Sequence, residues 1–101
     1  MGHVLAYVAT SHYLKAVAAV GGDDPEKVRE KMRVLPIEGN LIQNASIQSN
    51  GRVVFDMHIF EVKSPKESKG PADLYKKLAT LPGKDLFVPA EKSGCKFIAS
   101  N

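Results

Sequence analysis

The strongest structural constraint in the sequence is an Asn-Gly pair at positions 50 and 51, which stands directly before a long alternating run. Both residue types tolerate the positive φ angles of tight hairpin turns, so the pair predicts a turn between two antiparallel strands. In residues 52–63 the side chains alternate with a period of two, which predicts one long β-strand with a fully apolar face and a mixed face. The apolar face holds Val53, Phe55, Met57 and Ile59, and the mixed face holds Val54, Asp56, His58, Phe60 and Val62.

The N-terminal part of the chain predicts a mostly buried helix. Residues 4–20 contain no proline or glycine, and their apolar side chains cover a wide arc beside a narrow polar stripe of Ser11 and Lys15. Gly21 and Gly22 are expected to end this helix, because glycine readily adopts the backbone conformation that closes a helix. The segment is too short and too polar to span a bilayer, and it lacks the basic start and the cleavage site of a signal peptide. The chain as it stands is therefore expected in the cytoplasm.

A second helix is predicted to follow directly. Asp24 can cap its first turn, Pro25 suits its first position, and Pro36 stops it. Val28 and Met32 recur at helical spacing, which gives this helix one apolar stripe. The nearest surface on which that stripe can pack is the first helix.

The segment after the alternating run holds a loop and an ambiguous element. Residues 64–71 contain two prolines and a glycine among charged side chains, so they are predicted to form an exposed loop. In residues 72–81, the leucines Leu74, Leu78 and Leu81 have helical spacing, and local propensity favours a helix. The same segment can also form a strand, with alternate side chains on one face. The residues alone leave both possibilities open.

Size and composition indicate an ordinary soluble globular domain. Apolar residues make up 44% of the 101 residues and charged residues make up 25%, which is not the balance of a disordered chain. A domain of this size has a thin hydrophobic core, which a larger body or a second copy would reinforce. The net charge of +3 is mild, and the basic residues are spread along the chain rather than clustered. Nucleic-acid binding is therefore not expected.

No motif in the sequence carries a reaction or a metal. His3, His12 and His58 do not fall at ligand spacing with one another or with Cys95, so no metal site and no cofactor are expected. Cys95 has no second cysteine to pair with, and its expected role is that of a partly buried small side chain. Asp56 and His58 share one face of the alternating strand and can pair, but no nucleophile or oxyanion site accompanies them. The expectation is a solvated or hydrogen-bonded pair on the less buried face of the strand, and the chain is not expected to be an enzyme.

Several motifs, taken in order, resemble a known family. The segments that carry the resemblance are Tyr7, residues 12–17 (HYLKAV), residues 24–32, residues 56–63 (DMHIFEVK), residues 64–83 (SPKESKGPADLYKKLATLPG) and the tripeptide Ser93-Gly94-Cys95. Together they resemble the C-terminal part of the periplasmic solute-binding proteins that serve ABC transporters for branched-chain amino acids and small amides. The resemblance covers nearly the whole chain and depends on the number and order of the matches rather than on any single one.

The resemblance implies a fold. Members of that family are much longer two-lobed α/β receptors, with a ligand cleft between the lobes. Residues 1–101 are therefore expected to form a single partial domain with an α+β fold, in which two N-terminal helices precede a small, mainly antiparallel sheet. The family fold makes residues 72–81 a strand, against their local propensity, and places the 52–63 strand at or near a hinge between the lobes. Tyr7 lies near the cleft in relatives, and it is the one ligand contact that the resemblance implies.

The resemblance also implies a function. The full-length relative captures a small amino-acid-like solute in the periplasm and delivers it to a membrane permease, without catalysis. Because such receptors close two lobes around the ligand, the chain alone is not expected to bind solute. The alternative is a free-standing interaction module that covers its strand edges and its apolar first helix by forming a homo-oligomer.

Overall fold

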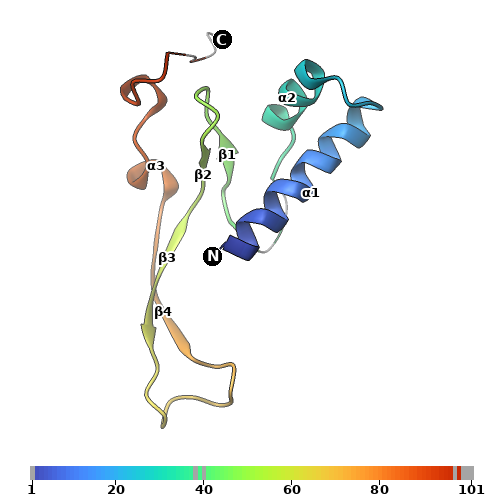
Figure 1. Ribbon diagram of the computed structural model, residues 1–101. Coiled ribbons are helices and arrows are strands. Elements are labelled where there is room, and N and C mark those ends of the chain that lie inside the picture. Colours follow the sequence, from blue (N-terminus) through green and yellow to red (C-terminus); the bar gives the residue numbers. More distant parts are fainter. Residues whose placement is uncertain (1, 38, 40, 97, 99–101) are drawn as a thin grey trace.

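The computed structural model describes residues 2–37, 39, 41–96 and 98. These residues form helices and two antiparallel sheets of two strands each, which confirms the expected α+β class. Figure 1 shows the first two helices beside one small sheet, while the second sheet projects away as a long hairpin. The elements are α1 (Gly2–Val20), α2 (Pro25–Val34), β1 (Ser46–Ile47), β2 (Val53–Val54), β3 (Met57–Val62), β4 (Tyr75–Leu81), α3 (Gly83–Leu86) and the 3₁₀ helix η1 (Ala90–Lys92).

Helix α1 ends and helix α2 begins at the predicted signals, while α1 starts at Gly2 rather than at residue 4. Gly21 has a φ angle of 76°, and its N–H donates to the carbonyl oxygen of Val17 at 2.9 Å, which closes α1. At the start of α2 the side chain of Asp24 accepts a hydrogen bond from the backbone N–H of Lys27 at 3.1 Å. Among the described residues no single helix has the length and hydropathy to cross a membrane; α1 and α2 meet that condition only as a pair, and they are bent by 112°.

Helices α1 and α2 pack on each other through a few small contacts. Ala16 on α1 is 0% exposed and Val28 on α2 is 3% exposed. His12 is also buried, and its Nε2 atom lies 2.8 Å from the carbonyl oxygen of Met32. The prediction of a mostly buried first helix is wrong, because the opposite face of α1 has no neighbour in the described part of the chain, and Tyr7 and Leu14 are exposed there.

The Asn-Gly pair lies in a hairpin turn, as predicted, but the turn has three loop residues rather than two. Gly51 has a φ angle of 82°, whereas Asn50 stays in the negative region. The N–H of Gly51 donates to the carbonyl oxygen of Gln48 at 2.9 Å, and the N–H of Gln48 donates to that of Arg52 at 2.8 Å. This is the pattern of a tight turn followed by one left-handed residue, and that residue has to be glycine-like. The turn joins β1 to β2.

The long alternating run is not a single strand, so that prediction is corrected. Strand β2 pairs with β1, with Val53 opposite Ile47 and Val54 opposite Ser46. Strand β3, which begins at Met57, pairs with β4 instead. Between the two strands the N–H of Asp56 donates to the carbonyl oxygen of Gln43 at 3.0 Å, so the backbone leaves one ladder before it joins the next. Alternation continues through this change of partner because both strands keep the same period.

Residues 75–81 form strand β4, as the resemblance implied and against their local helical propensity. The antiparallel register pairs Met57 with Leu81 and Val62 with Tyr75, with an irregularity next to Ile59 that leaves Leu78 as the extra residue. The rings of His58, Phe60 and Tyr75 form an edge-to-face row, with centroid separations of 6.0 and 6.3 Å. These pairing and ring contacts are tertiary, and they outweigh the propensity of the isolated segment.

The loop between β3 and β4 is exposed, as predicted, and it is tied together by its own side chains. The Nζ atom of Lys63 lies 2.7 and 2.8 Å from the two carboxylate oxygens of Asp73, which also accepts the N–H of Lys69 at 3.0 Å. Glu67 accepts both the N–H and the hydroxyl of Ser64, at 3.0 and 2.7 Å. The loop therefore has a defined shape without packing on a core.

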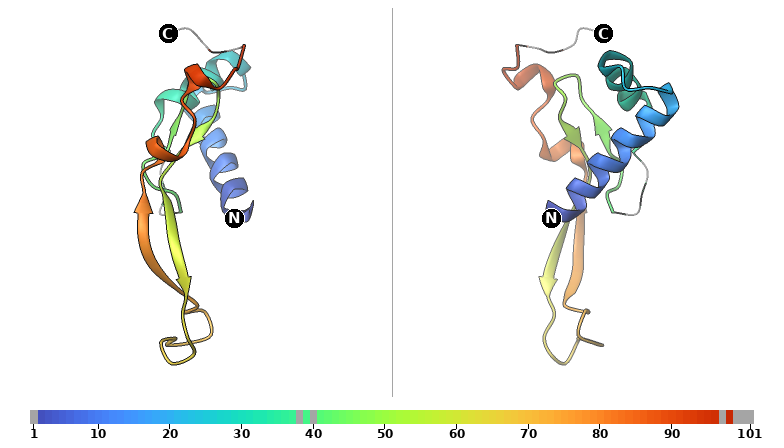
Figure 2. Two further views of the ribbon diagram at one scale, coloured as in Figure 1. Left: turned by 90° about the vertical axis from the view of Figure 1, so that its left-hand side faces the viewer. Right: turned by 45° about the vertical axis from the view of Figure 1, so that its right-hand side comes forward.

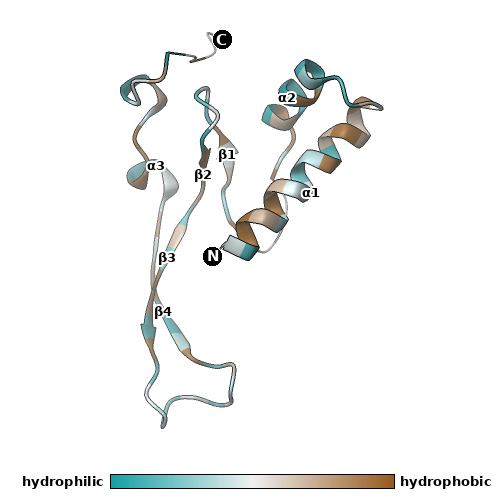
Figure 3. Cartoon of the chain, in the orientation of Figure 1, coloured by the Kyte–Doolittle hydropathy of each residue, from teal (hydrophilic) through white to brown (hydrophobic). Residues whose placement is uncertain are grey.

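The overall shape is extended. The radius of gyration is 17.1 Å, whereas a compact domain of 101 residues has a value of about 13 Å. The accessible surface is 7785 Å², against about 5,600 Å² for a compact protein of 11.0 kDa. Figure 2 shows from two further directions that the β3–β4 hairpin stands away from the helices. Hydrophobic residues occur along α1 and in the strands (Figure 3), and many of them are exposed.

Candidate functional site

The candidate site is a groove where the hairpin leaves the rest of the fold. We call α1, α2, β1 and β2, together with the segments that join them, the body, and β3, β4 and the loop between them the hairpin. The groove has a volume of about 320 Å³, which falls in the range of small-molecule sites, and its walls are mostly apolar. The body contributes Val4, Leu41 and Ile42, the hairpin contributes Met57, His58 and Phe60, and Phe55 and Asp56 lie where the two parts join.

Asp56 is the acidic group of the groove, and it has three hydrogen bonds. One carboxylate oxygen accepts the amide of Asn44 at 2.6 Å, and the other accepts the backbone N–H of Gly83 at 2.9 Å. Its own N–H donates to the carbonyl oxygen of Gln43 at 3.0 Å. The bonds from Asn44 and Gly83, in that order, hold the pKa of the Asp56 carboxyl below its usual value, because both stabilise the charged form. Asp56 is therefore an anion that joins three separate segments.

His58 does not hydrogen-bond to Asp56. The Nδ1 atom of His58 lies 3.0 Å from the hydroxyl oxygen of Thr80 on the neighbouring strand, and its ring packs on Phe60. Asp56 and His58 thus share the groove, as their common strand face predicted, but each has its own partners. His58 therefore pairs with a threonine hydroxyl of β4, and Asp56 takes no part in that contact.

Tyr7 lies on α1, one helical turn beyond the groove residue Val4. Positions three residues apart are neighbours on a helix surface, so Tyr7 lies next to Val4 on α1. The Tyr7 side chain is 66% exposed, and it does not line the groove in this structure. The segment around Leu41 and Ile42, which does line it, was missed at the sequence level, because nothing in its local pattern reports a contact with β3.

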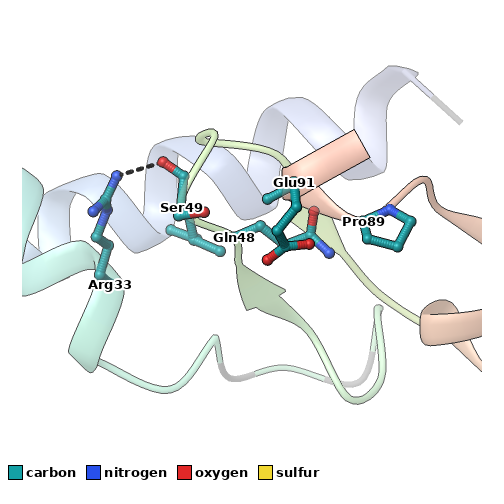
Figure 4. A pocket seen from close by; sticks show the side chains of 7 residues that line it. Arg33, Gln48, Ser49, Pro89 and Glu91 are labelled. Carbon is teal, nitrogen blue, oxygen red and sulfur yellow. Dashed lines mark hydrogen bonds between the residues drawn. The ribbon is translucent and has the colours of Figure 1, made fainter. Parts of the chain in front are cut away.

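A second, more polar cavity of about 340 Å³ lies between the end of α2, the β1–β2 turn and η1. Figure 4 shows Arg33 on one side, where its guanidinium donates to the carbonyl oxygen of Ser49 at 3.1 Å, and Glu91 on the other. The Oε1 atom of Gln48 is buried and accepts no hydrogen bond from the described residues. This cavity is bounded by the body and by η1, and the hairpin has no part in it.

A third cavity of about 210 Å³ is lined by residues of the body and by Phe55, and it is almost wholly apolar. Its lining includes His12 and Met32, the two residues that the His12 hydrogen bond connects. Within the described residues no group of three or more His, Cys, Asp or Glu side chains is placed to hold a metal ion. Cys95 is a free, half-buried thiol.

Acidification should weaken the fold through three carboxylates. Hydrogen bonds lower the pKa of Asp56, and those from Lys63 to Asp73 and from Ser64 to Glu67 lower the pKa of these two groups likewise. A carboxyl whose folded pKa lies below its unfolded value contributes stability above the unfolded value of about 4 and loses it as pH falls through the folded pKa. The urea midpoint should therefore be level near neutral pH and should fall below about pH 4. Asp73→Asn should flatten that fall, and a midpoint that rises on acidification would contradict the assignment.

Comparisons with known proteins agree with this architecture. The sequence pattern of a family described as periplasmic binding proteins matches residues 1–71. A periplasmic binding protein from Burkholderia mallei is similar in structure, with a TM-score of 0.80 and 36% identity over 90% of this chain. A branched chain amino acid ABC transporter periplasmic ligand-binding protein from Burkholderia xenovorans has a TM-score of 0.83 and 32% identity over 92% of this chain. No curated protein sequence matches the chain.

The two matches differ from this chain in length. The aligned region covers 24% of the Burkholderia mallei protein and 25% of the Burkholderia xenovorans protein, so the chain spans about a quarter of either one. Both similar proteins are binding proteins by description, and neither is described as an enzyme. The family pattern covers most of the chain, and the structural agreement extends over nine tenths of it. On these grounds the chain belongs to the periplasmic binding protein family.

Proposed function

We propose that the chain forms the C-terminal part of a receptor that captures a branched-chain amino acid or a small amide in the periplasm and delivers it to an ABC permease. The groove between body and hairpin is the observation that carries this proposal. It is apolar enough for an aliphatic side chain, it has a carboxylate and an imidazole at hand for polar groups, and it occurs in a chain of the periplasmic binding protein family. No step of this function requires catalysis.

The chain supplies only part of the solute site, namely the groove between body and hairpin. The groove is open toward solvent, and the accessible surface exceeds that of a compact protein of this mass by roughly 2,200 Å². This excess is comparable to the area of a permanent interface between two proteins. The exposed apolar residues on α1 and on the hairpin belong to the surface that the rest of the receptor would cover. Affinity for the solute would then need the rest of the receptor to close over the groove.

The isolated chain should show no measurable heat on titration with leucine in a calorimeter, because a groove that is open to solvent cannot bury most of the solute. A chimera in which this chain replaces the matching quarter of the Burkholderia xenovorans protein should bind leucine. In that chimera, Tyr7→Ala should weaken binding about tenfold if Tyr7 contacts the solute.

Tyr13→Ala is the matched control, since Tyr13 is an exposed tyrosine of the same helix but lies on the opposite side of α1 from the groove residue Val4. Micromolar binding by the isolated chain would refute the proposal that it supplies only part of the solute site. A folded chimera that binds neither leucine nor a small amide would refute the proposed function.

The same uncovered surface supports a second candidate, an oligomer of identical chains. Strands β3 and β4 pair only with each other in the described structure, so each has a free edge that a second copy could extend. Sedimentation distinguishes the two candidates. A stable monomer over a wide concentration range would exclude the oligomer and leave the receptor proposal standing.

A further inference from the structure

The hairpin is attached to the rest of the chain by two single-strand crossings. One consists of Phe55 and Asp56, between the end of β2 and the start of β3. The other consists of Pro82 and Gly83, where β4 has ended and α3 begins. Strands β3 and β4 pack extensively on each other and make no comparable contact with α1, α2, β1 or β2. The angle between hairpin and body therefore depends on the backbone conformation and the contacts of these two crossings.

The two crossings lie against each other. A methyl group placed on Gly83 would meet the carbonyl oxygen of Phe55 at 2.6 Å, so the two backbones are in direct contact there. The ring of Phe55 also lies 5.7 Å, centroid to centroid, from the ring of Phe87 on the returning segment. This contact keeps the two crossings together, but it does not by itself fix the angle between hairpin and body.

Asp56 supplies the directional contacts at this joint. Its carboxylate binds Asn44 of the body loop at 2.6 Å and the N–H of Gly83 in the return crossing at 2.9 Å. Its backbone N–H is bound to Gln43, next to Asn44. One side chain therefore connects the outgoing crossing, the return crossing and the body. Asn44 has a φ angle of 52°, a conformation that asparagine and aspartate tolerate better than other side chains.

We propose that Asp56 is a positioning residue, which fixes the angle between hairpin and body and so sets the width of the groove. The groove has body residues on one side, hairpin residues on the other and Asp56 at the joint, so a rotation there must open or close it. Asp56 is held by hydrogen bonds near the surface rather than by core packing, and such bonds can break and re-form without unfolding either part. The consequence for solute affinity rests on the proposed function, whereas the joint itself does not.

The test measures the distance between spin labels on Ala18→Cys in α1 and Lys66→Cys in the hairpin loop, both exposed, in a Cys95→Ser background. The unsubstituted joint should give a narrow distance distribution. Asn44→Asp places two carboxylates together and should broaden the distribution to about twice its width. The reciprocal double variant Asn44→Asp with Asp56→Asn restores an amide opposite a carboxylate and should return the narrow distribution. Asp85→Asn, on α3, is the control and should change nothing.

Restoration by the swapped pair is the deciding result, because a merely structural loss would not be repaired by it. If Asn44→Asp also lowers the helical circular dichroism, the double variant must recover both signals. A distribution that is already broad without substitution, that stays narrow in Asn44→Asp, or that remains broad in the double variant overturns the proposal. In the leucine-binding chimera the same single change should raise Kd about tenfold and the swap should restore it. A chimera that binds no solute would refute the proposed function, while the label distances would still decide the role of Asp56.

Discussion

Replacing Gly83 with alanine should destabilise the fold by about 3 kcal/mol, at the upper end of what overpacking usually costs. The added methyl group would lie 2.6, 2.8 and 2.9 Å from the oxygen, carbon and nitrogen atoms of Phe55, all of them backbone atoms. A flexible side chain could move aside at little cost, whereas a movement of the Phe55 backbone would displace the joint between β2 and β3. The free energy of unfolding from urea titration measures the effect.

Gly70→Ala is the control for this substitution. Gly70 has no positive φ angle and no atom within 4 Å of the position its Cβ would occupy, so its substitution should change stability by less than about 0.5 kcal/mol. If Gly83→Ala were as mild as Gly70→Ala, the two crossings would not be in contact in solution.

Replacing Ala16 with leucine should cost about 1–3 kcal/mol, because the position has no room for a larger side chain. Ala16 is 0% exposed where α1 packs on α2, opposite the small buried surface that includes Val28. The added atoms would push the two helices apart and would enlarge the apolar cavity already present in the body. Thermal and urea unfolding, followed by circular dichroism, would report the loss.

Ala18→Leu supplies the matched comparison, since Ala18 is on the same helix but faces solvent. The two substitutions are identical in helix propensity and differ only in burial, so the difference between them isolates the packing of α1 on α2. Equal effects at both positions would show that the helices do not pack together in the free chain.

The sequence predicts those elements whose signals are local. Asp24 and Pro25 define the start of α2, and Gly21 closes α1, because capping depends on a few neighbouring residues. The Asn-Gly turn was predictable for the same reason, although its loop length was not. These features need no knowledge of distant contacts.

The remainder of the fold depends on partners that lie far away in sequence. The alternation in residues 52–63 does not reveal that the pairing partner changes at Asp56, since both strands have the same period. Residues 75–81 form a strand only because β3 is there to pair with, and the family resemblance was the sole guide to that outcome. For the groove, the strand pattern placed Asp56 and His58 on one face, but it could not show that Leu41 and Ile42 form the opposite wall. Tyr7 remains a prediction.

The closure of the hairpin loop has a practical consequence for engineering. The pairing of Lys63 with Asp73 and the hydrogen bond from the N–H of Lys63 to Leu74 at 2.9 Å lock the base of the loop. The free energy of closing a flexible loop rises only slowly with its length. A reporter peptide or an epitope tag inserted between Lys66 and Glu67 would thus leave the register of β3 and β4 unchanged. The tip of the loop offers a place to graft a sensor far from the groove.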